Sequence, residues 1–370
     1  MWFLRTTSFY CLKNNLLQLD LAADFLDLSL QSLSIFLGQA FLPKIFEVGI
    51  FGFLRILLRG AAQVMFQCNA WCGLLFLAGI FWGAYSSGLP EVAWGALLGV
   101  MVSTATGFIL NLQPEEGQEG LWGFNGILVG CAFPTFLGDT IWMWIALALC
   151  AALTTWVRTG LNNLMRGWSI NSFTFPFVLC TWFFLLGAHT MHSLPMLHSS
   201  SHVMESLHGL HHHMGLEGVW EAVQVWLRGI SQVFLIDSWV TGLLFFLGLA
   251  VSSRWAALWA LVGSALSMGM AVVMGMPVEH IDQGLYSFSA VLTAIALASV
   301  FYKPSWRSAM WATLGILVTV VVQAAMNVWV QPFGVATLTA PFCITTWLFL
   351  LPLLKFDEQH PDHSQWHHRS

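Results

Sequence analysis

The chain has 370 residues, of which 57% are hydrophobic and only 8% charged, whereas an average soluble domain carries about 25% charged residues. Such a chain cannot cover a water-facing surface with polar groups, so soluble folds are excluded and an integral membrane protein is expected. The formal net charge of −5 gives no indication of nucleic-acid binding, because the few charges fall in expected loops.

Residues 1–45 are expected to form a cytoplasmic lead-in. Arg5 and Lys13 lie near its start, but no apolar segment with a small-residue cleavage site follows, so no signal peptide is expected. Three aspartates within residues 15–43 make a spanning helix there costly. The sequence therefore predicts an amphipathic or irregular segment.

Ten segments approach the roughly 20 apolar residues that a spanning helix needs. They lie near 71–87, 92–111, 121–137, 140–157, 173–188, 239–253, 255–275, 285–301, 308–327 and 338–354. Two further apolar stretches, about 46–69 and 218–237, contain arginine and glutamine and precede the first and the sixth of these segments. We expect them to be re-entrant or tilted, and such backbone is tolerated at membrane depth only against protein or a cavity.

Three blocks of sequence occur twice, in the same order and at nearly constant separation. LRGAAQVMF at 58–66 matches LRGISQVFL at 227–235, GLWGFNGILVGCAF at 120–133 matches GLYSFSAVLTAIAL at 284–297, and FTFPFVLCTWFFLL at 173–186 matches LTAPFCITTWLFLL at 338–351. The chain is therefore interpreted as a tandem duplication. Its expected parts are a first repeat at 46–190, a His-rich external loop at 191–217, a second repeat at 218–354 and a His-rich cytoplasmic tail at 355–370.

Five spans in each half is an odd number, so the two copies should enter the membrane from opposite sides. With both termini cytoplasmic, every lysine and arginine except Arg228 falls on the inner side, as the positive-inside rule requires. The predicted fold is all-α, with ten transmembrane helices in two inverted five-span repeats, each with a tilted re-entrant helix. Inverted repeats imply a pathway at their interface, near the midplane.

Taken together, the three paired blocks resemble the urea transporter family, over about 46–354. The resemblance implies a homotrimer in the inner membrane of a bacterial cell, not an enzyme and without a cofactor. Each protomer would have its own narrow pore for passive urea permeation, with two flattened outer slots walled by phenylalanines and a central constriction.

Phe124 with Leu128, and Phe288 with Leu292, are each four residues apart on one helix face and could form the slot walls. The alternative is that these are ordinary lipid-facing or packing residues. Because urea is planar and neutral, flat apolar walls would select its plane.

Gln63 and Gln232 occupy equivalent repeat positions, and an intramembrane glutamine serves either as interhelical glue or as part of a pathway. By resemblance, both accept urea N–H groups, while Val64 and Val233 line the walls beside them.

Phe66 matches the family's second slot phenylalanine, whereas its counterpart in the other half is Leu235, which leaves one slot with an aliphatic wall. Thr174 and Thr339 each stand two residues before a proline and are the candidates for the central site. Their alternative role is a hydrogen bond to their own helix backbone.

No carboxylate or histidine falls in the middle of a predicted span, which favours passive permeation over a proton-coupled pump. A channel for ammonia or another small neutral amide stays open as an alternative. The seven cysteines form no CxxC pair and are expected to be buried free thiols.

Three histidine clusters formally imitate the ligand boxes of membrane di-iron oxidases, since imidazole suits iron. They are His198 and His202, then His208, His211 and His212, and finally His363, His367 and His368. The predicted topology places the first two clusters and the third on opposite sides of the membrane, so this reading is remote. The eight histidines between His189 and His213 are expected to be solvated or to bind metals weakly.

Overall fold

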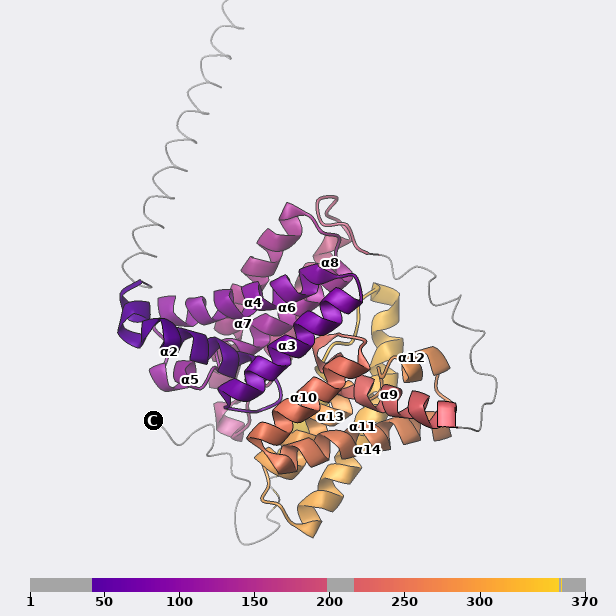
Figure 1. Cartoon of the computed structure of the whole chain (residues 1–370). Coiled ribbons are helices and arrows are strands. Elements are labelled where there is room, and N and C mark those ends of the chain that lie inside the picture. The colour runs from indigo at the N-terminus through magenta and orange to yellow at the C-terminus, as the bar shows by residue number, and fades with distance from the viewer. Residues whose placement is uncertain (1–41, 198–215, 353, 355–370) are drawn as a thin grey trace, which may run out of the picture. The chain divides into compact units, whose positions relative to one another are not determined.

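The computed structural model describes residues 42–197, 216–352 and 354, and its regular elements there are helices (Figure 1). The predicted lead-in, most of the His-rich loop and almost all of the His-rich tail lie outside the described residues. The helices of the first half are α2 (Leu42–Gln63), α3 (Ala70–Ser86), α4 (Pro90–Ile109), α5 (Pro114–Gln118), α6 (Phe124–Phe136), α7 (Ile141–Met165), η1 (Arg166–Trp168) and α8 (Phe175–Ala188). Those of the second half are α9 (Leu216–Ser231), η2 (Gln232–Phe234), α10 (Trp239–Ser252), α11 (Arg254–Val273), α12 (Val278–Asp282), α13 (Phe288–Ile295), η3 (Ala296–Val300), α14 (Trp306–Val330), η4 (Gln331–Phe333) and α15 (Ala340–Leu350).

The chain divides into two compact units between Phe53 and Leu54. Of the first unit, the structure describes only the start of α2, where Gly49 has a φ of 73° and interrupts the helix. Glycine adopts this left-handed conformation without the steric cost that a Cβ would add. All the contacts described below lie within the second unit.

Ten helices coincide with the ten predicted spans, but they differ in length. Within the described ranges, four are long and apolar enough to cross a membrane alone, namely Pro90–Ile109, Ile141–Trp168, Arg254–Val273 and Trp306–Phe333. A fifth candidate is the pair Gly218–Phe234 and Trp239–Ser252, bent by 74°. The protein is thus an all-helical membrane protein, with four or five spans by length alone.

The other apolar helices are short, between 11 residues in α15 and 17 in α3. At 1.5 Å per residue they reach only about 16–26 Å, less than the ~30 Å hydrocarbon core. They are Ala70–Ser86, Phe124–Phe136, Phe175–Ala188, Phe288–Val300 and Ala340–Leu350. None of these five helices is therefore long enough to cross the hydrocarbon core by itself.

The irregular joints of the two halves share their backbone conformation. The 3-10 turn before α10 ends at Leu235 with a φ of 61°, and Phe66 before α3 has a φ of 63°. Phe173 and Leu338, just before α8 and α15, have φ values of 50° and 51°. These left-handed conformations are uncommon for bulky residues, so the same unusual path occurs twice.

The two halves meet along α3 and α10, which pack against each other. In Figure 1 the first helix is violet and the second orange. Phe76 and Phe245 have ring centroids 4.8 Å apart. A Cβ on Gly79 would lie 2.8 Å from the Phe245 ring, and one on Gly248 would lie 2.9 Å from the Phe76 ring. These contacts are reciprocal between the two halves.

A second reciprocal contact joins α8 and α15 to the opposite half. The Trp182 indole donates to the Ala336 carbonyl oxygen at 2.9 Å, and the Trp347 indole donates to the Asn171 carbonyl oxygen at 2.9 Å. Trp347 lies 165 residues after Trp182, and Ala336 lies 165 residues after Asn171, so the two bonds join equivalent positions. The tryptophans thus hold the irregular segments that precede α15 and α8.

Candidate functional site

A pocket opens between α2, α6, α7 and the segment before α8. It encloses about 370 Å³ of space, the solvent at its mouth included. Its lining combines one aromatic wall with several hydrogen-bonding side chains. The lining residues are Gln63, Val64, Phe66, Phe124, Arg158, Asn162, Asn171, Ser172, Phe173 and Thr174.

Gln63 ends α2 with one half of its amide engaged and the other half free. Its Nε2 donates to the Glu119 carbonyl oxygen at 3.0 Å. Its Oε1 is buried and has no hydrogen-bond partner within the described structure. An unpaired buried acceptor costs about 1–3 kcal/mol, and a donor brought into the pocket would remove that cost.

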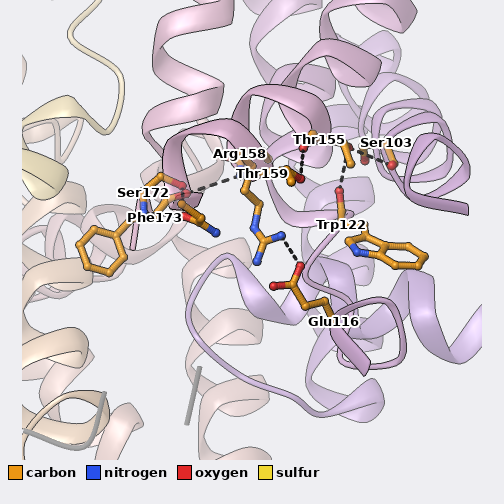
Figure 2. A network of polar contacts seen from close by, with 10 residues as sticks. Ser103, Glu116, Trp122, Thr155, Arg158, Thr159, Ser172 and Phe173 are labelled. Atoms are coloured by element: carbon orange, nitrogen blue, oxygen red, sulfur yellow. Dashed lines mark hydrogen bonds and ion pairs between the residues drawn. The ribbon is translucent and has the colours of Figure 1, made fainter. Parts of the chain in front are cut away.

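Phe124 begins α6 and contacts a buried charge. The Arg158 guanidinium carbon lies 5.8 Å from the centroid of the Phe124 ring, over its face. An Arg158 Nη1 pairs with a Glu116 carboxylate oxygen at 2.8 Å, as Figure 2 shows. Arg158 is only 4% exposed, so the pair places a charge at the pocket wall.

The helix that carries Arg158 is held by side-chain hydrogen bonds one turn before and one turn after the arginine (Figure 2). The Thr155 hydroxyl donates to the carbonyl oxygens of Ser103 and Trp122, at 2.9 and 3.3 Å. On the next turn, Asn162 accepts from both the amide and the hydroxyl of Ser172, at 2.9 and 2.7 Å. α7 is thereby bound to α4, to the start of α6 and to the segment before α8.

Thr174 and Thr339 meet where the two halves of the chain touch. Their hydroxyl oxygens are 2.7 Å apart, and both residues are buried. The Cys343 sulfur lies 3.4 Å from the Thr174 hydroxyl. The sequence left open that each threonine hydroxyl bonds the backbone of its own helix. In the structure the two hydroxyls bond each other instead.

Four phenylalanines gather beside this pair. Phe66 lies with its ring edge-on to Phe173, Phe301 and Phe342, at centroid distances of 6.3, 6.0 and 5.9 Å. Phe173 lies 5.5 Å from both Phe301 and Phe342. Two of the rings come from each half, and two of the four, Phe66 and Phe173, line the pocket.

Asn125 holds the backbone that presents Thr174. Its Oδ1 accepts from the Phe177 amide at 3.2 Å, and its Nδ2 donates to the Phe173 carbonyl oxygen at 3.5 Å. These two backbone groups flank Thr174 in the sequence. The amide side chain therefore spans the irregular entry to α8, where the helix has no side-chain cap at Thr174.

The predicted residues of the second half are placed similarly but with other neighbours. Gln232, Val233, Phe288 and Thr339 are buried, and Leu235 is half-buried. The first half brings Gln63, Val64, Phe66, Phe124 and Thr174 around one pocket. Leu128 and Leu292 are fully buried one helical turn below the two phenylalanines, and Leu128 is not among the residues that line the pocket.

Sequence reasoning missed Arg158, Asn162, Asn171, Ser172 and Phe173 as pocket residues. The predicted span at 140–157 was expected to end before Arg158, which was assigned to an inner loop; instead, α7 continues to Met165 and buries the arginine. An alignment of the two halves could have indicated that Arg158 belongs to a helix. α7 and α14 both have 25 residues, so Arg158 aligns with Gln323, which is 2% exposed.

Gln323 shows what the second half has in place of the charge. Its Nε2 donates to Asn327 Oδ1 at 2.9 Å and to the Thr337 hydroxyl at 2.6 Å. Its Oε1 is buried without a partner in the part of the chain that the structure describes. The position of Glu116 is taken by His280, at the same distance before the left-handed Gly284 as Glu116 is before Gly120.

Arg228, the one cation predicted to lie outside, is neutralised locally. Its Nε lies 3.2 Å from the Asp237 carboxylate, and its Nη1 donates to the Asp282 carbonyl oxygen at 3.1 Å. Burial raises the pKa of Asp282, while the Arg228 charge opposes that shift. The equivalent Arg59 also donates to a backbone oxygen, that of Gln118, at 2.7 Å.

No metal-binding group is found in the described ranges. They contain no set of three or more His, Cys, Asp or Glu side chains placed to hold an ion. The histidines of the di-iron interpretation lie outside the described residues. Of the cysteines, Cys72, Cys131, Cys150, Cys180 and Cys343 are free and buried, as predicted, whereas Cys68 is exposed.

These observations define the class first: a helical multi-pass membrane protein whose broken, short helices surround a polar pocket next to the contact between its halves. Sequence comparison then places it more closely. The family described as Urea transporter matches residues 54–353. Urea transporter 1 of Ovis aries is 28% identical over 308 residues, covering 81% of this chain and 77% of the relative.

Urea transporter 1 of Rattus norvegicus is 27% identical over 312 residues, with the same two shares covered. Because the match spans most of the sequence, the chain belongs to the urea transporter family. This is a family of transporters and not of enzymes, which confirms both the resemblance of the paired blocks and the prediction that the protein is no enzyme.

Proposed function

We propose that this protein lets urea cross the membrane passively, in the manner of a channel, through a narrow pore between two inverted repeats. The observation that carries the proposal is the pocket of the first half. Its lining includes Gln63, whose Oε1 has no partner in the described structure, and Phe124. It also includes Thr174, whose hydroxyl pairs with that of Thr339.

The chemistry of these groups suits urea. Urea is small, planar and neutral, with one carbonyl acceptor and four N–H donors. Each water hydrogen bond that is lost and not replaced costs about 1–3 kcal/mol. Gln63 Oε1 would accept from one N–H group, and the threonine hydroxyls can both donate and accept. Val64, Phe66 and Phe124 would supply walls that admit a flat molecule.

The second half would form the second slot, with Gln232, Val233, Leu235, Phe288 and Leu292 in the equivalent places. The threonine pair between the slots would be the narrowest point. Because the two hydroxyls bond each other at 2.7 Å, a passing urea has to replace that bond with its own. The replacement leaves no polar group unpaired, which keeps the barrier low.

Passive transport is supported by the kind of charge that is buried. Among the described residues, Arg158 is the one charged side chain in the buried class. An arginine cannot release its proton in a protein, so it cannot carry protons across. Proton-coupled carriers normally hold a titratable group at depth.

The proposed topology has ten helices in two inverted five-span repeats, with both termini cytoplasmic, in the inner membrane of a bacterial cell. Two sets of reciprocal contacts across the halves support the two-fold relation between the copies. They are the contact of Phe76 with Phe245 and the matching indole bonds of Trp182 and Trp347 to backbone oxygens of the opposite half. The short helices support a pathway built of broken elements. The assembly is proposed to be a homotrimer in the bilayer, each protomer with its own pore.

Urea flux into proteoliposomes, followed by stopped-flow light scattering, tests the proposal. We expect flux well above that of empty liposomes without a proton or sodium gradient. A requirement for either gradient would contradict the passive mechanism. Ammonia and acetamide, tested in the same vesicles, decide the alternative of a channel for ammonia or another small amide; faster flux of either than of urea would favour it.

A further inference from the structure

We propose that Arg158 is a specificity-determining residue of the first slot, where its guanidinium donates a hydrogen bond to the carbonyl oxygen of the substrate and repels cations. The inference rests on the proposed function, because it assigns a role within the same pore. It concerns the discrimination between neutral carbonyl compounds and cations of the same shape.

The guanidinium is placed where a substrate would be sensed. It lies over the face of Phe124, at 5.8 Å from the ring centroid, and Arg158 lines the same pocket as Gln63. Gln63 offers the pocket an unpaired acceptor. A guanidinium offers only donors. The pocket thus has an acceptor for N–H groups and a donor for a carbonyl oxygen.

The charge of Arg158 is not cancelled on the pocket side. Its partner Glu116 bonds one Nη1 at 2.8 Å but is not among the pocket-lining residues. The Glu116 side chain is 30% exposed and that of Arg158 only 5%. Water therefore screens the carboxylate more than the guanidinium, and the potential that a solute meets in the pocket is positive.

The second half lacks this feature. Gln323 occupies the position of Arg158, and its two bonds to Asn327 and Thr337 leave a neutral amide with a free oxygen. A cation would meet no repulsion from Gln323. We therefore infer that only the first slot excludes cations in this way. Every solute that crosses the pore has to pass this slot.

Guanidinium ion is the decisive probe because it is planar and nearly the same size as urea, but carries a charge and has no acceptor. In wild-type proteoliposomes we expect rapid urea flux and little uptake of radiolabelled guanidinium, with the membrane potential clamped by potassium and valinomycin. Wild-type uptake of guanidinium as fast as that of urea would overturn the inference without any variant.

The variant that tests the residue is Glu116→Gln with Arg158→Gln, which removes the pair without changing the net charge and gives position 158 the residue found at 323. We expect the ratio of guanidinium to urea uptake to rise about 10- to 100-fold, the effect of one unit charge a few ångströms away in a partly buried site. A purely structural role of the pair would lower both fluxes and leave this ratio unchanged, which would overturn the inference.

Two further variants separate the charge from its position. Arg158→Lys keeps the charge and should retain the wild-type ratio even if it folds less well. Arg166→Gln removes an exposed cation just beyond the end of the same helix, and it should leave the ratio unchanged. If Arg166→Gln raises the ratio as much as the pair variant does, the effect belongs to the general surface charge and not to the slot. Absence of urea flux in the wild type would instead refute the proposed function.

Discussion

The pocket of the first half and the equivalent region of the second half share a backbone but differ in their side chains. The left-handed positions recur as Phe66 and Leu235, and as Phe173 and Leu338, with φ values that agree within a few degrees. Such conformations cost free energy for bulky residues, so their occurrence at equivalent places indicates that the two halves share the same path of the chain.

Several side chains in and near the pocket differ between the halves. Besides the aromatic and aliphatic pair at 66 and 235, the copies differ at Asn125 and Ser289, where the serine hydroxyl is buried without a partner in the described structure. They differ again at Arg158 and Gln323. The pocket of the first half therefore has an aromatic side chain and a charge where the second half has Leu235 and Gln323.

Removing the aromatic walls should have the largest effect. Phe124→Ala and Phe288→Ala each delete a buried aromatic side chain, which typically costs about 3–5 kcal/mol of stability. We expect the urea concentration that half-saturates flux to rise in both variants, or flux to be lost, because urea binds more weakly without the wall. A lower thermal transition in detergent should accompany this change. Phe183→Ala on the exposed face of α8 is the control, and equal losses there would make the phenylalanines ordinary packing residues.

Removing the central hydroxyls should come next. Thr174→Val and Thr339→Val keep the shape of the side chain but break the bond between the two oxygens. We expect urea flux to fall about 10-fold in either variant, since one unmade hydrogen bond costs about 1–3 kcal/mol. Thr106→Val is matched, because that hydroxyl bonds the carbonyl oxygen of its own helix at Val102. Unchanged flux in both single variants and the double variant would place the central site elsewhere.

Exchanging Asn125 for the residue of the other half should have an intermediate effect. Asn125→Ser leaves the Phe173 carbonyl oxygen and the Phe177 amide without their side-chain partner. We expect a loss of about 1–2 kcal/mol in unfolding free energy and a severalfold fall in urea flux. Ser289→Asn is the reciprocal test. If Asn125→Ser changes stability but not flux, the bridge supports the fold without positioning Thr174.

Restoring symmetry at the second slot should have a smaller effect. Leu235→Phe gives position 235 the side chain of its counterpart, and Phe66 shows that this backbone conformation accepts a phenylalanine. An added aromatic contact is worth about 0.5–1.5 kcal/mol, so the urea concentration that half-saturates flux should fall by about 2- to 10-fold. No change in saturation would show that position 235 does not wall the slot.

Shortening the His-rich loop should have the smallest effect. The Leu197 amide donates to the Phe136 carbonyl oxygen, and the Gly138 amide donates to the Pro195 carbonyl oxygen, at 2.8 Å each. The deletion therefore has to leave these residues in place. Deletion of 199–213 should leave urea flux within about 2-fold of the wild type, as expected of an external loop segment outside the pore. Loss of flux in a variant with a normal thermal transition would make the loop part of the pathway.

The sequence by itself determined the class of the protein, the duplication and the places of its helices. Low charge and long apolar segments indicate a chain that lies in the lipid bilayer. The three repeated blocks lie where the helices of both halves are interrupted. It also indicated Gln63, Val64, Phe66, Phe124 and Thr174, which line one pocket; their role in conduction stays a prediction.

Only the tertiary structure decided which of the apolar segments are full-length and which polar groups face one another. The apolar segments at 285–301 and 338–354 look equally continuous, but their helices begin only at Phe288 and Ala340. The pairing of Thr174 with Thr339, and of Arg158 with Glu116, joins residues 165 and 42 positions apart. No local pattern encodes such contacts, because they arise only when the two halves fold against each other and α5 brings Glu116 to α7.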